Sequence, residues 1–321
     1  MKGFWTQLER PFFALAPMYD VTDAAFRRMI AKYSRPDVIF TEFVSVDGLA
    51  HPDGREKLMH HLWFDDSEHP IVAQVFGVEP KNFEKAAELC HELGFDGIDI
   101  NMGCPEKNII KQGAGAALIC ASDRACDIIS ATLSGAGDMP VSVKTRIGFK
   151  KEEIDTWLPH IFAQEISAVT VHLRTQREMS KTVAHWDVMP RIVAMRDGLR
   201  PEMLVLGNGD VHTIAEGKKR VKETGCDGVM IGRGVFGNPW FFADPAPAIS
   251  VAQKLHGMVE HTQLFEELFT GVKNFAIMKK HYKAYANGFP FAGELRAELM
   301  EARDAREVEK IVNTFLHNHS L

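Results

Sequence analysis

The residues best suited to chemistry lie in one short segment, residues 97–119, which reads GIDINMGCPEKNIIKQGAGAALI. An apolar run ends there in Asn101, and a single thiol, Cys104, follows immediately beside Pro105. A thiol can donate a proton as a general acid, or act as a nucleophile if its pKa is lowered. Which role applies depends on the elements that hold this loop in place.

Other side chains able to bind ligands or transfer protons also come at the ends of apolar runs. In chain order these ends carry Pro17-Met18, Thr41-Glu42, Gln74, Asn101, Lys144-Thr145-Arg146, His172 with Arg174 beyond it, Asn208-Gly209-Asp210 and Gly232-Arg233. Solubility alone does not predict so many residues of these types at such positions. They form one site if the runs are strands whose ends meet.

The runs themselves indicate a parallel sheet. They cover residues 11–17, 37–42, 70–76, 97–101, 141–145, 168–172, 202–208 and 227–232. Most are continuously apolar, which is typical of strands buried on both faces. Helical patterns lie between many of them, for example at residues 81–93, 122–133 and 210–224. The alternation predicts an α/β fold, a (β/α)8 TIM barrel, with a doubly wound sheet as the alternative. Residues 45–64 read mainly as loop.

The sequence pattern changes from alternating strand and helix signals to helix signals alone after the Pro/Ala-rich segment near residue 245. Helical periodicity continues to the C-terminus without a clear strand. We therefore expect two domains, a barrel over residues 1–245 and a small all-helical domain over residues 246–321.

Glycine-containing turns follow the last two strands, in LGNGDV and MIGRGVFGNP. Glycines let backbone N–H groups approach a phosphate closely, and barrel enzymes often hold a phosphate at this place. The alternative is that these glycines only end the strands.

Composition limits the other classes of function. The formal net charge of −6 argues against binding polyanions through bulk charge, although it leaves room for a local basic patch. The five cysteines form no CxxC pair, so neither a zinc framework nor a disulfide ladder is indicated, which fits a reducing cytoplasm. We expect no metal cluster, no signal peptide and no membrane span.

Seven segments together resemble the tRNA-dihydrouridine synthase family. They are APMYDVTDAAFRRM, VAQVFG, DGIDINMGCPEKNIIKQGAGAALI, VSVKTRIGF, VTVHLRT, VLGNGDV and GCDGVMIGRGVFGNPWFF. Their order and spacing match that family throughout residues 16–242, and residues 276–312 resemble its C-terminal helical domain. The NMGCP block with the following GAG is the most specific part.

The resemblance implies an FMN-dependent enzyme that reduces the bond between carbons 5 and 6 of a uridine in tRNA, with NADPH as reductant. Hydride would reach carbon 6, and Cys104 would donate the proton that carbon 5 requires. A thiol with an ordinary pKa of about 8.5 is mostly protonated at neutral pH, so it suits this role. Flipping a base out of a loop costs little, so a D-loop uridine is the expected target.

The resemblance also implies a flavin site at the strand ends. Pro17, Met18 and Tyr19 match the segment that lies along the flavin, and Gln74 is expected to hydrogen-bond the isoalloxazine edge. The expected ligands of the ribityl chain and phosphate are Asn208, Gly209, Asp210, Gly232 and Arg233.

Three further residues are expected beside the reacting rings. Lys144 should reach the electron-rich side of the flavin, where a cation stabilises the reduced anion. His172 should contact the flavin or the uracil carbonyl. Asn101 should shape the cysteine loop and bind uracil or flavin.

Contacts with RNA are expected from both parts of the chain. Arg146 and Arg174 are expected to meet RNA phosphate or the target uridine, with simple surface charge as the alternative. The C-terminal cluster expected to bind RNA contains Lys279, Lys280, His281, Tyr282 and Lys283, with Tyr285 beside them. Residues 246–321 hold equal numbers of basic and acidic residues, so binding there has to come from the sorting of charge.

Two smaller expectations concern the barrel mouth. Leu173 stands where the family usually has glycine, and we expect it to narrow the mouth. Glu42 and Asp47 are expected only to shape the rim.

Other hypotheses remain open at this point. A flavin barrel resembling the dihydroorotate dehydrogenases would act on a free pyrimidine, but it would not need the helical domain. A non-catalytic RNA-binding protein would not need Cys104, Lys144 and His172. A flavin-free aldolase or isomerase could use Lys144 as a Schiff base but leaves Cys104 unexplained. We expect a monomer, and the sequence does not identify which uridine is reduced.

Overall fold

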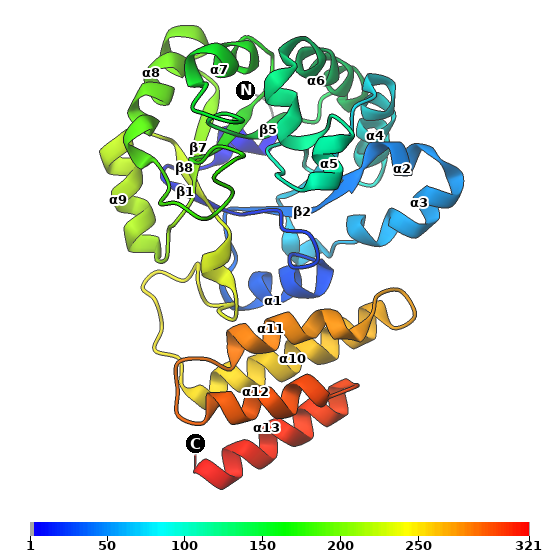
Figure 1. Cartoon of the computed structure of the whole chain (residues 1–321), viewed down its shortest axis with the longest axis vertical. Helices are drawn as coiled ribbons and strands as arrows, with labels where there is room; N and C mark the ends of the chain where they lie inside the picture. The colour runs from blue at the N-terminus through cyan, green and yellow to red at the C-terminus, as the bar shows by residue number, and fades with distance from the viewer. Residues whose placement is uncertain (1–2, 321) are drawn as a thin grey trace.

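The computed structural model describes residues 3–320, and it places a closed barrel of eight parallel strands before a bundle of helices (Figure 1). Each strand pairs with its neighbours in chain order, and β1 closes the barrel against β8. The strands are β1 (Phe12–Leu15), β2 (Val38–Ser45), β3 (Ile71–Phe76), β4 (Gly97–Met102), β5 (Val141–Arg146), β6 (Ala168–His172), β7 (Leu204–Asn208) and β8 (Gly228–Ile231). The predicted TIM barrel is confirmed.

Helices cover the outside of the barrel and continue beyond it. The α-helices are α1 (Ala24–Ser34), α2 (Val46–Ala50), α3 (Pro52–Leu58), α4 (Pro80–Glu92), α5 (Lys107–Lys111), α6 (Ser122–Ala136), α7 (Ile154–Phe162), α8 (Met189–Leu199), α9 (Ile214–Thr224), α10 (Val251–Phe269), α11 (Met278–Tyr285), α12 (Ala292–Glu301) and α13 (Ala305–His319). The 3-10 helices are η1 (Gly3–Gln7), η2 (Met59–Leu62), η3 (Asp66–Glu68), η4 (Gly115–Cys120), η5 (Trp186–Val188), η6 (Arg233–Val235) and η7 (Phe275–Ile277).

Two segments differ from the sequence prediction. The segment expected as loop after β2 forms α2 and α3, because Ser45 caps one and Pro52 begins the other. The helix expected from residue 210 begins only at Ile214, where the Thr213 side chain accepts from the Glu216 N–H. The residues between β7 and α9 therefore remain free to line a cavity.

Helices α10–α13 pack around a hydrophobic core of their own, which extends to Ala24 and Ala25 of α1. Figure 1 shows this bundle on one side of the barrel, with α1 nearest to it. Phe26 of α1 also contacts the rings of His261 and His281, whose centroids lie 5.6 and 5.5 Å from its own. The barrel and the bundle therefore share a packed apolar seam.

One buried cation joins the barrel and the bundle electrostatically. Lys273, after α10, places its Nζ atom 2.9 Å from Glu42 and 3.6 Å from Asp23. All three side chains are at most 4% exposed. The expectation that Glu42 only shapes the rim is therefore wrong, because this carboxylate binds the bundle.

Within residues 3–320, no helix is both long enough and apolar enough to span a membrane. The same residues contain no group of three or more His, Cys, Asp or Glu side chains arranged to hold a metal ion.

Candidate functional site

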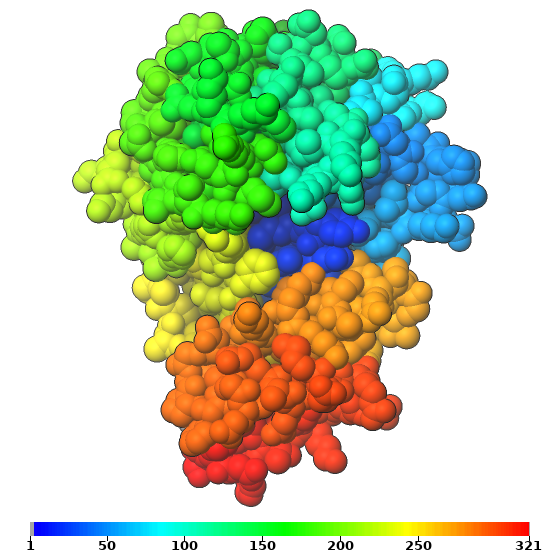
Figure 2. All heavy atoms as spheres, viewed as in Figure 1, coloured from blue at the N-terminus to red at the C-terminus, as the bar shows by residue number. Residues whose placement is uncertain are grey.

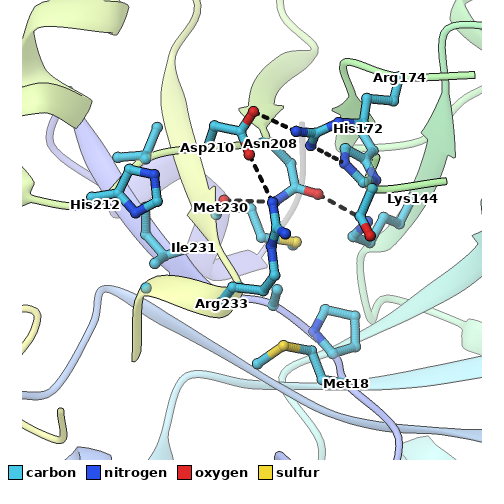
Figure 3. Close-up of a pocket in the computed structure, with 17 residues that line it drawn as sticks. Met18, Lys144, His172, Arg174, Asn208, Asp210, His212, Met230, Ile231 and Arg233 are labelled. Atoms are coloured by element: carbon cyan, nitrogen blue, oxygen red, sulfur yellow. Dashed lines mark hydrogen bonds and ion pairs between the residues drawn. The ribbon is translucent and has the colours of Figure 1, made fainter. Parts of the chain in front are cut away.

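A cavity of about 750 Å³, counting its part open to solvent, lies over the C-terminal ends of the barrel strands (Figure 3). The lining residues are Ala16, Pro17, Met18, Lys144, His172, Arg174, Ser180, Asn208, Gly209, Asp210, Val211, His212, Met230, Ile231, Gly232, Arg233 and Gly234. Strands β1, β5, β6, β7 and β8 thus meet at one site.

Lys144 provides a positive charge at the floor of the cavity. Its Nζ atom donates to the Asn208 Oδ1 atom at 3.3 Å, and Asn208 in turn donates to the Met230 carbonyl at 2.8 Å. Burial, with a contribution from Arg146, lowers the pKa of Lys144 to about 8. The ammonium group is therefore still mostly protonated at neutral pH, but it is easier to deprotonate than a surface lysine.

His172 is neutral in this site. Burial lowers its pKa well below the ordinary value, and four surrounding cations, beginning with Arg146 and Lys144, act in the same direction. The Arg174 guanidinium lies 3.1 Å from His172 Nε2. Because a guanidinium can only donate, Nε2 accepts and the ring proton resides on Nδ1. Figure 3 shows His172 beside Arg174 and Lys144.

Asp210 binds two arginines across the cavity (Figure 3). It accepts from Arg174 and, at 2.7 Å, from Arg233. Gly209, just before it, has φ +135°, and a Cβ atom there would lie 2.7 Å from the Ala184 Cβ atom. Only glycine fits this turn without strain.

The cavity has one end suited to an anion. Arg233 has a side chain that is 58% exposed, so its guanidinium is accessible beyond its contact with Asp210. Gly232 and Gly234 flank it and also line the cavity. An arginine fork between glycines is a donor set that matches phosphate.

Cys104 is held in a fixed loop beside β4. Its sulfur-bearing side chain is buried, with 8% of the residue exposed. The Asn101 Oδ1 atom accepts from the N–H groups of Gly103 at 3.1 Å and Cys104 at 2.9 Å. Burial raises the pKa of the Cys104 thiol, so it remains protonated at neutral pH. This favours an acid over a nucleophile.

A chain of buried amides positions Asn101. Its Nδ2 atom donates to Gln74 Oε1 at 2.9 Å, and Gln74 Nε2 donates to Asp99 Oδ2 at 2.6 Å. Ser142 donates to the other oxygen of Asp99 at 2.6 Å. Sequence reasoning missed Asp99 and Ser142. The available signal was a carboxylate in the middle of the apolar strand GIDIN.

The structure brings most of the expected flavin ligands together in the cavity, but Gln74, Tyr19 and Asn101 are not among its lining residues, and neither is Cys104. Gln74 is fully buried and belongs to the amide chain, and it is not among the cavity-lining residues. Tyr19 is 52% exposed and also lies outside the lining set. Its ring instead packs against Phe43 and His61.

The two arginines expected to meet RNA phosphate or the target uridine are buried, so the alternative of simple surface charge is wrong, and Arg174 lines the cavity. Arg146 is 5% exposed and donates to the carbonyls of Gly103, Thr175 and Met179. Arg174 is 2% exposed and binds the Thr182 carbonyl, His172 and Asp210. Their guanidinium groups therefore connect the loops around the cavity.

The expectation that the whole C-terminal cluster contacts RNA is also wrong. His281, Tyr282 and Tyr285 are fully buried in the bundle core, and Lys279 donates to the Met300 carbonyl. Lys280 and Lys283 remain exposed. The buried set follows the i, i+3, i+4, i+7 spacing of an apolar helix face beginning at Met278, so periodicity could have identified it.

Leu173 does not narrow the mouth of the barrel. It is fully buried in the main hydrophobic core, and its N–H donates to the Asn208 carbonyl at 3.0 Å. Sequence reasoning also missed Ser180, His212 and Met230 as lining residues. The first two lie in loops, where no periodic pattern marks them.

Comparison with known proteins places this chain beside the dihydrouridine synthases. The family model "Dihydrouridine synthase (Dus)" matches residues 14–320. The "Probable tRNA-dihydrouridine synthase 2" of Bacillus subtilis is 41% identical over 98% of this chain and 97% of its own length. A "Probable tRNA-dihydrouridine synthase" of Staphylococcus epidermidis is 40% identical over 98% of this chain and 96% of its own.

Among solved structures, a variant of NCR from Zymomonas mobilis has a TM-score of 0.50 at 17% identity. The match covers 75% of this chain and 90% of that one. At this level of identity the likeness concerns the fold alone.

Proposed function

Because the chain belongs to the dihydrouridine synthase family, we propose that it reduces the 5,6 double bond of a D-loop uridine in tRNA, with FMN as its cofactor and NADPH as reductant. The observation that carries this proposal is the placement of Lys144, His172 and Arg233 around one cavity, with the Cys104 loop directly after the neighbouring strand β4. We propose that the reaction takes place in the cytoplasm, since five cysteines without a CxxC pair suit a reducing compartment.

The residues of the cavity fit FMN. Arg233 with Gly232 and Gly234 would hold the phosphate, since they combine an exposed guanidinium with close backbone access. Asn208 and Asp210 would contact the ribityl chain. Lys144 would lie near the flavin ring, where its charge favours an anionic reduced form. When bound, FMN reduced by NADPH supplies the hydride that reaches carbon 6 of the uracil.

Cys104 would supply the proton. As carbon 6 gains hydride, carbon 5 develops negative charge and takes the proton from the thiol sulfur. The thiolate that remains is reprotonated from water. Burial keeps the thiol protonated until that moment, and Asn101 fixes its loop through two backbone N–H groups. Neutral His172 can donate from Nδ1 to a uracil carbonyl without adding a charge.

The helical bundle would contact the rest of the tRNA. We propose that residues 246–321 form a separate RNA-contacting domain, with residues 1–245 as the catalytic domain. Lys280 and Lys283 are its exposed candidates for phosphate contacts from the expected cluster. The bundle adjoins the barrel through Lys273 and α1, so a tRNA could contact both parts at once.

An anaerobic assay tests the proposal. The flavin is reduced with NADPH, unmodified tRNA transcript is added, and flavin absorbance is followed. Reoxidation by tRNA together with dihydrouridine in the RNA is the expected result. Reoxidation only by uracil or orotate would favour the small-molecule alternative, and a protein that binds no flavin would refute the cavity assignment.

A further inference from the structure

Tyr19 is a half-exposed aromatic residue at the edge of the cavity with no role in the site described above. It directly follows Met18, which lines the cavity, yet its own ring lies outside the lining set. The residue is 52% exposed. Figure 2 shows dark blue atoms of this N-terminal part of the chain at the surface between the barrel and the orange bundle.

The rings of Phe43 and His61 pack against the Tyr19 ring. Its centroid lies 5.5 Å from that of Phe43 and 5.5 Å from that of His61, with interplanar angles of 33° in both cases. The next residue, Asp20, donates its N–H to Glu42 at 2.5 Å. Met18 donates to Thr22 at 2.9 Å. A pre-ordered aromatic surface loses little conformational entropy when a flat ligand stacks on it.

Aromatic rings continue from Tyr19 toward the bundle. The ring centroids of His61 and His60 are 4.0 Å apart, and those of His60 and Trp63 are 6.3 Å apart. Trp63 is 38% exposed and stacks on Phe269 of α10 at an interplanar angle of 8°. The exposed rings therefore follow the seam between the barrel and the bundle.

A cation lies near the same loop. Lys280 of α11 is exposed, and the ring of the next residue, His281, has its centroid 5.5 Å from that of Phe26 in α1, the helix that follows the Tyr19 loop. Aromatic faces combined with nearby cations are the usual means of binding unpaired nucleotides, because every base has a π face and every nucleotide a phosphate.

We propose that Tyr19 is a stacking platform for an unpaired nucleobase next to the target uridine, and that Lys280 contacts the adjoining phosphate. This inference rests on the proposed function, since the cavity must first accept a base flipped out of the RNA. A flipped base leaves its neighbours without a stacking partner on one side, and Tyr19 offers a replacement beside the cavity.

Equilibrium binding of a tRNA transcript to the oxidised, flavin-loaded protein tests this proposal in Tyr19→Phe, Tyr19→Leu and Tyr19→Ala variants. Tyr19→Phe keeps the π face and should bind like the wild type. Tyr19→Leu and Tyr19→Ala should bind roughly 5- to 150-fold more weakly, the range expected for one lost base stack. Lys280→Ala should reduce the dependence of affinity on salt by about one phosphate contact.

Phe291 provides the matched control. It is also 52% exposed, but it stacks on His319 within the bundle. Phe291→Ala should leave affinity for RNA unchanged. Wild-type affinity in Tyr19→Leu and Tyr19→Ala would overturn the inference, as would an equal loss in Phe291→Ala. A raised KM for NADPH with unchanged RNA affinity would overturn it in favour of the reductant's adenine.

The wild-type result distinguishes failure of the Tyr19 stacking platform from failure of the proposed function. If the wild type forms dihydrouridine in tRNA but the Tyr19 variants bind RNA normally, only the stacking platform is refuted. If the wild type neither binds nor reduces tRNA, the proposed function falls and the inference falls with it.

Discussion

Gln74 and Asn101 share one buried hydrogen bond whose direction is fixed by a third residue. Gln74 must turn its N–H group toward Asp99, because a carboxylate can only accept. Its carbonyl oxygen therefore faces Asn101, and Asn101 presents its own oxygen to the N–H groups of Gly103 and Cys104. The ionised form of Asp99 thus sets the orientation of the cysteine loop through two amides.

This polarity predicts a rescue between two positions. Asn101→Asp still accepts from the cysteine loop, but it places a second oxygen against the Gln74 carbonyl. Gln74 cannot reverse, since Asp99 would then face an acceptor. We expect a loss of about 1–3 kcal/mol in the free energy of unfolding at neutral pH, measured in urea.

Adding Asp99→Asn to that variant should restore its stability. The amide introduced at position 99 can donate to a reversed Gln74 while still accepting from Ser142, and Gln74 can then donate to the carboxylate introduced at position 101. That carboxyl group can itself donate once it is protonated, so the deficit of the single variant should shrink as the pH falls. Equal stability of the single variant and the wild type at neutral pH would show that the direction of the amides is unimportant.

The second prediction concerns Gly115, which packs against the cysteine loop. It has φ +59°, and a Cβ atom there would lie 2.9 Å from the Cys104 carbonyl oxygen. Gly115→Ala should displace Cys104 and slow reduction of tRNA while flavin content is retained. Gly113→Ala is the control, since its φ is +82° but its Cβ atom would meet nothing closer than 3.6 Å. Similar rates in both variants would contradict the steric argument.

The third prediction concerns the cation between the barrel and the bundle. Lys273→Met leaves Glu42 and Asp23 buried without their positive partner, which should cost about 3–5 kcal/mol of unfolding free energy. Lys32→Met is the matched control, because Lys32 also joins α1 to the bundle through Glu260 but its side chain is 59% exposed. We expect about 0–1 kcal/mol there. Chemical denaturation measures both, and equal losses would refute the role of burial.

The fourth prediction is acid sensitivity from His261 and His281. Both rings are fully buried, and none of their nitrogens has a hydrogen-bond partner within residues 3–320. Burial lowers the pKa of His261 to about 3 and that of His281 well below its usual value. Below pH of about 6.5 the unfolded chain binds protons that the folded chain does not. Stability should therefore fall as the pH drops from about 6.5 toward about 3.

The slope is at most about 1.4 kcal/mol per pH unit for each histidine. The double variant His261→Leu/His281→Leu should lose this part of the pH dependence. His256 lies on the exposed side of α10, the helix that carries His261, and His256→Leu is the control variant. An unchanged slope in the double variant would show that other groups govern acid unfolding.

The barrel could be predicted from sequence because its strands are buried on both faces and therefore read as continuous apolar runs. The positions of Lys144, His172 and Asn208 followed, since parallel strands bring their ends to one edge. Long side chains were harder to place. Arg146 and Arg174 point inward to backbone carbonyls, and only the loops folded around them explain that. The position of the Tyr19 ring outside the cavity was also hard to predict. The turn after Tyr19 depends on a hydrogen bond from Asp20 to Glu42, which is more than twenty residues away in the sequence.

The most direct test of the account is a single turnover of wild-type and Cys104→Ala protein with tRNA. Both are loaded with FMN and reduced with NADPH, and dihydrouridine is measured by mass spectrometry over time. We predict that the wild type converts the uridine and that Cys104→Ala does so about 10²- to 10⁴-fold more slowly, at unchanged flavin content. Equal rates of dihydrouridine formation in the two proteins would contradict the assignment of Cys104 as the proton donor.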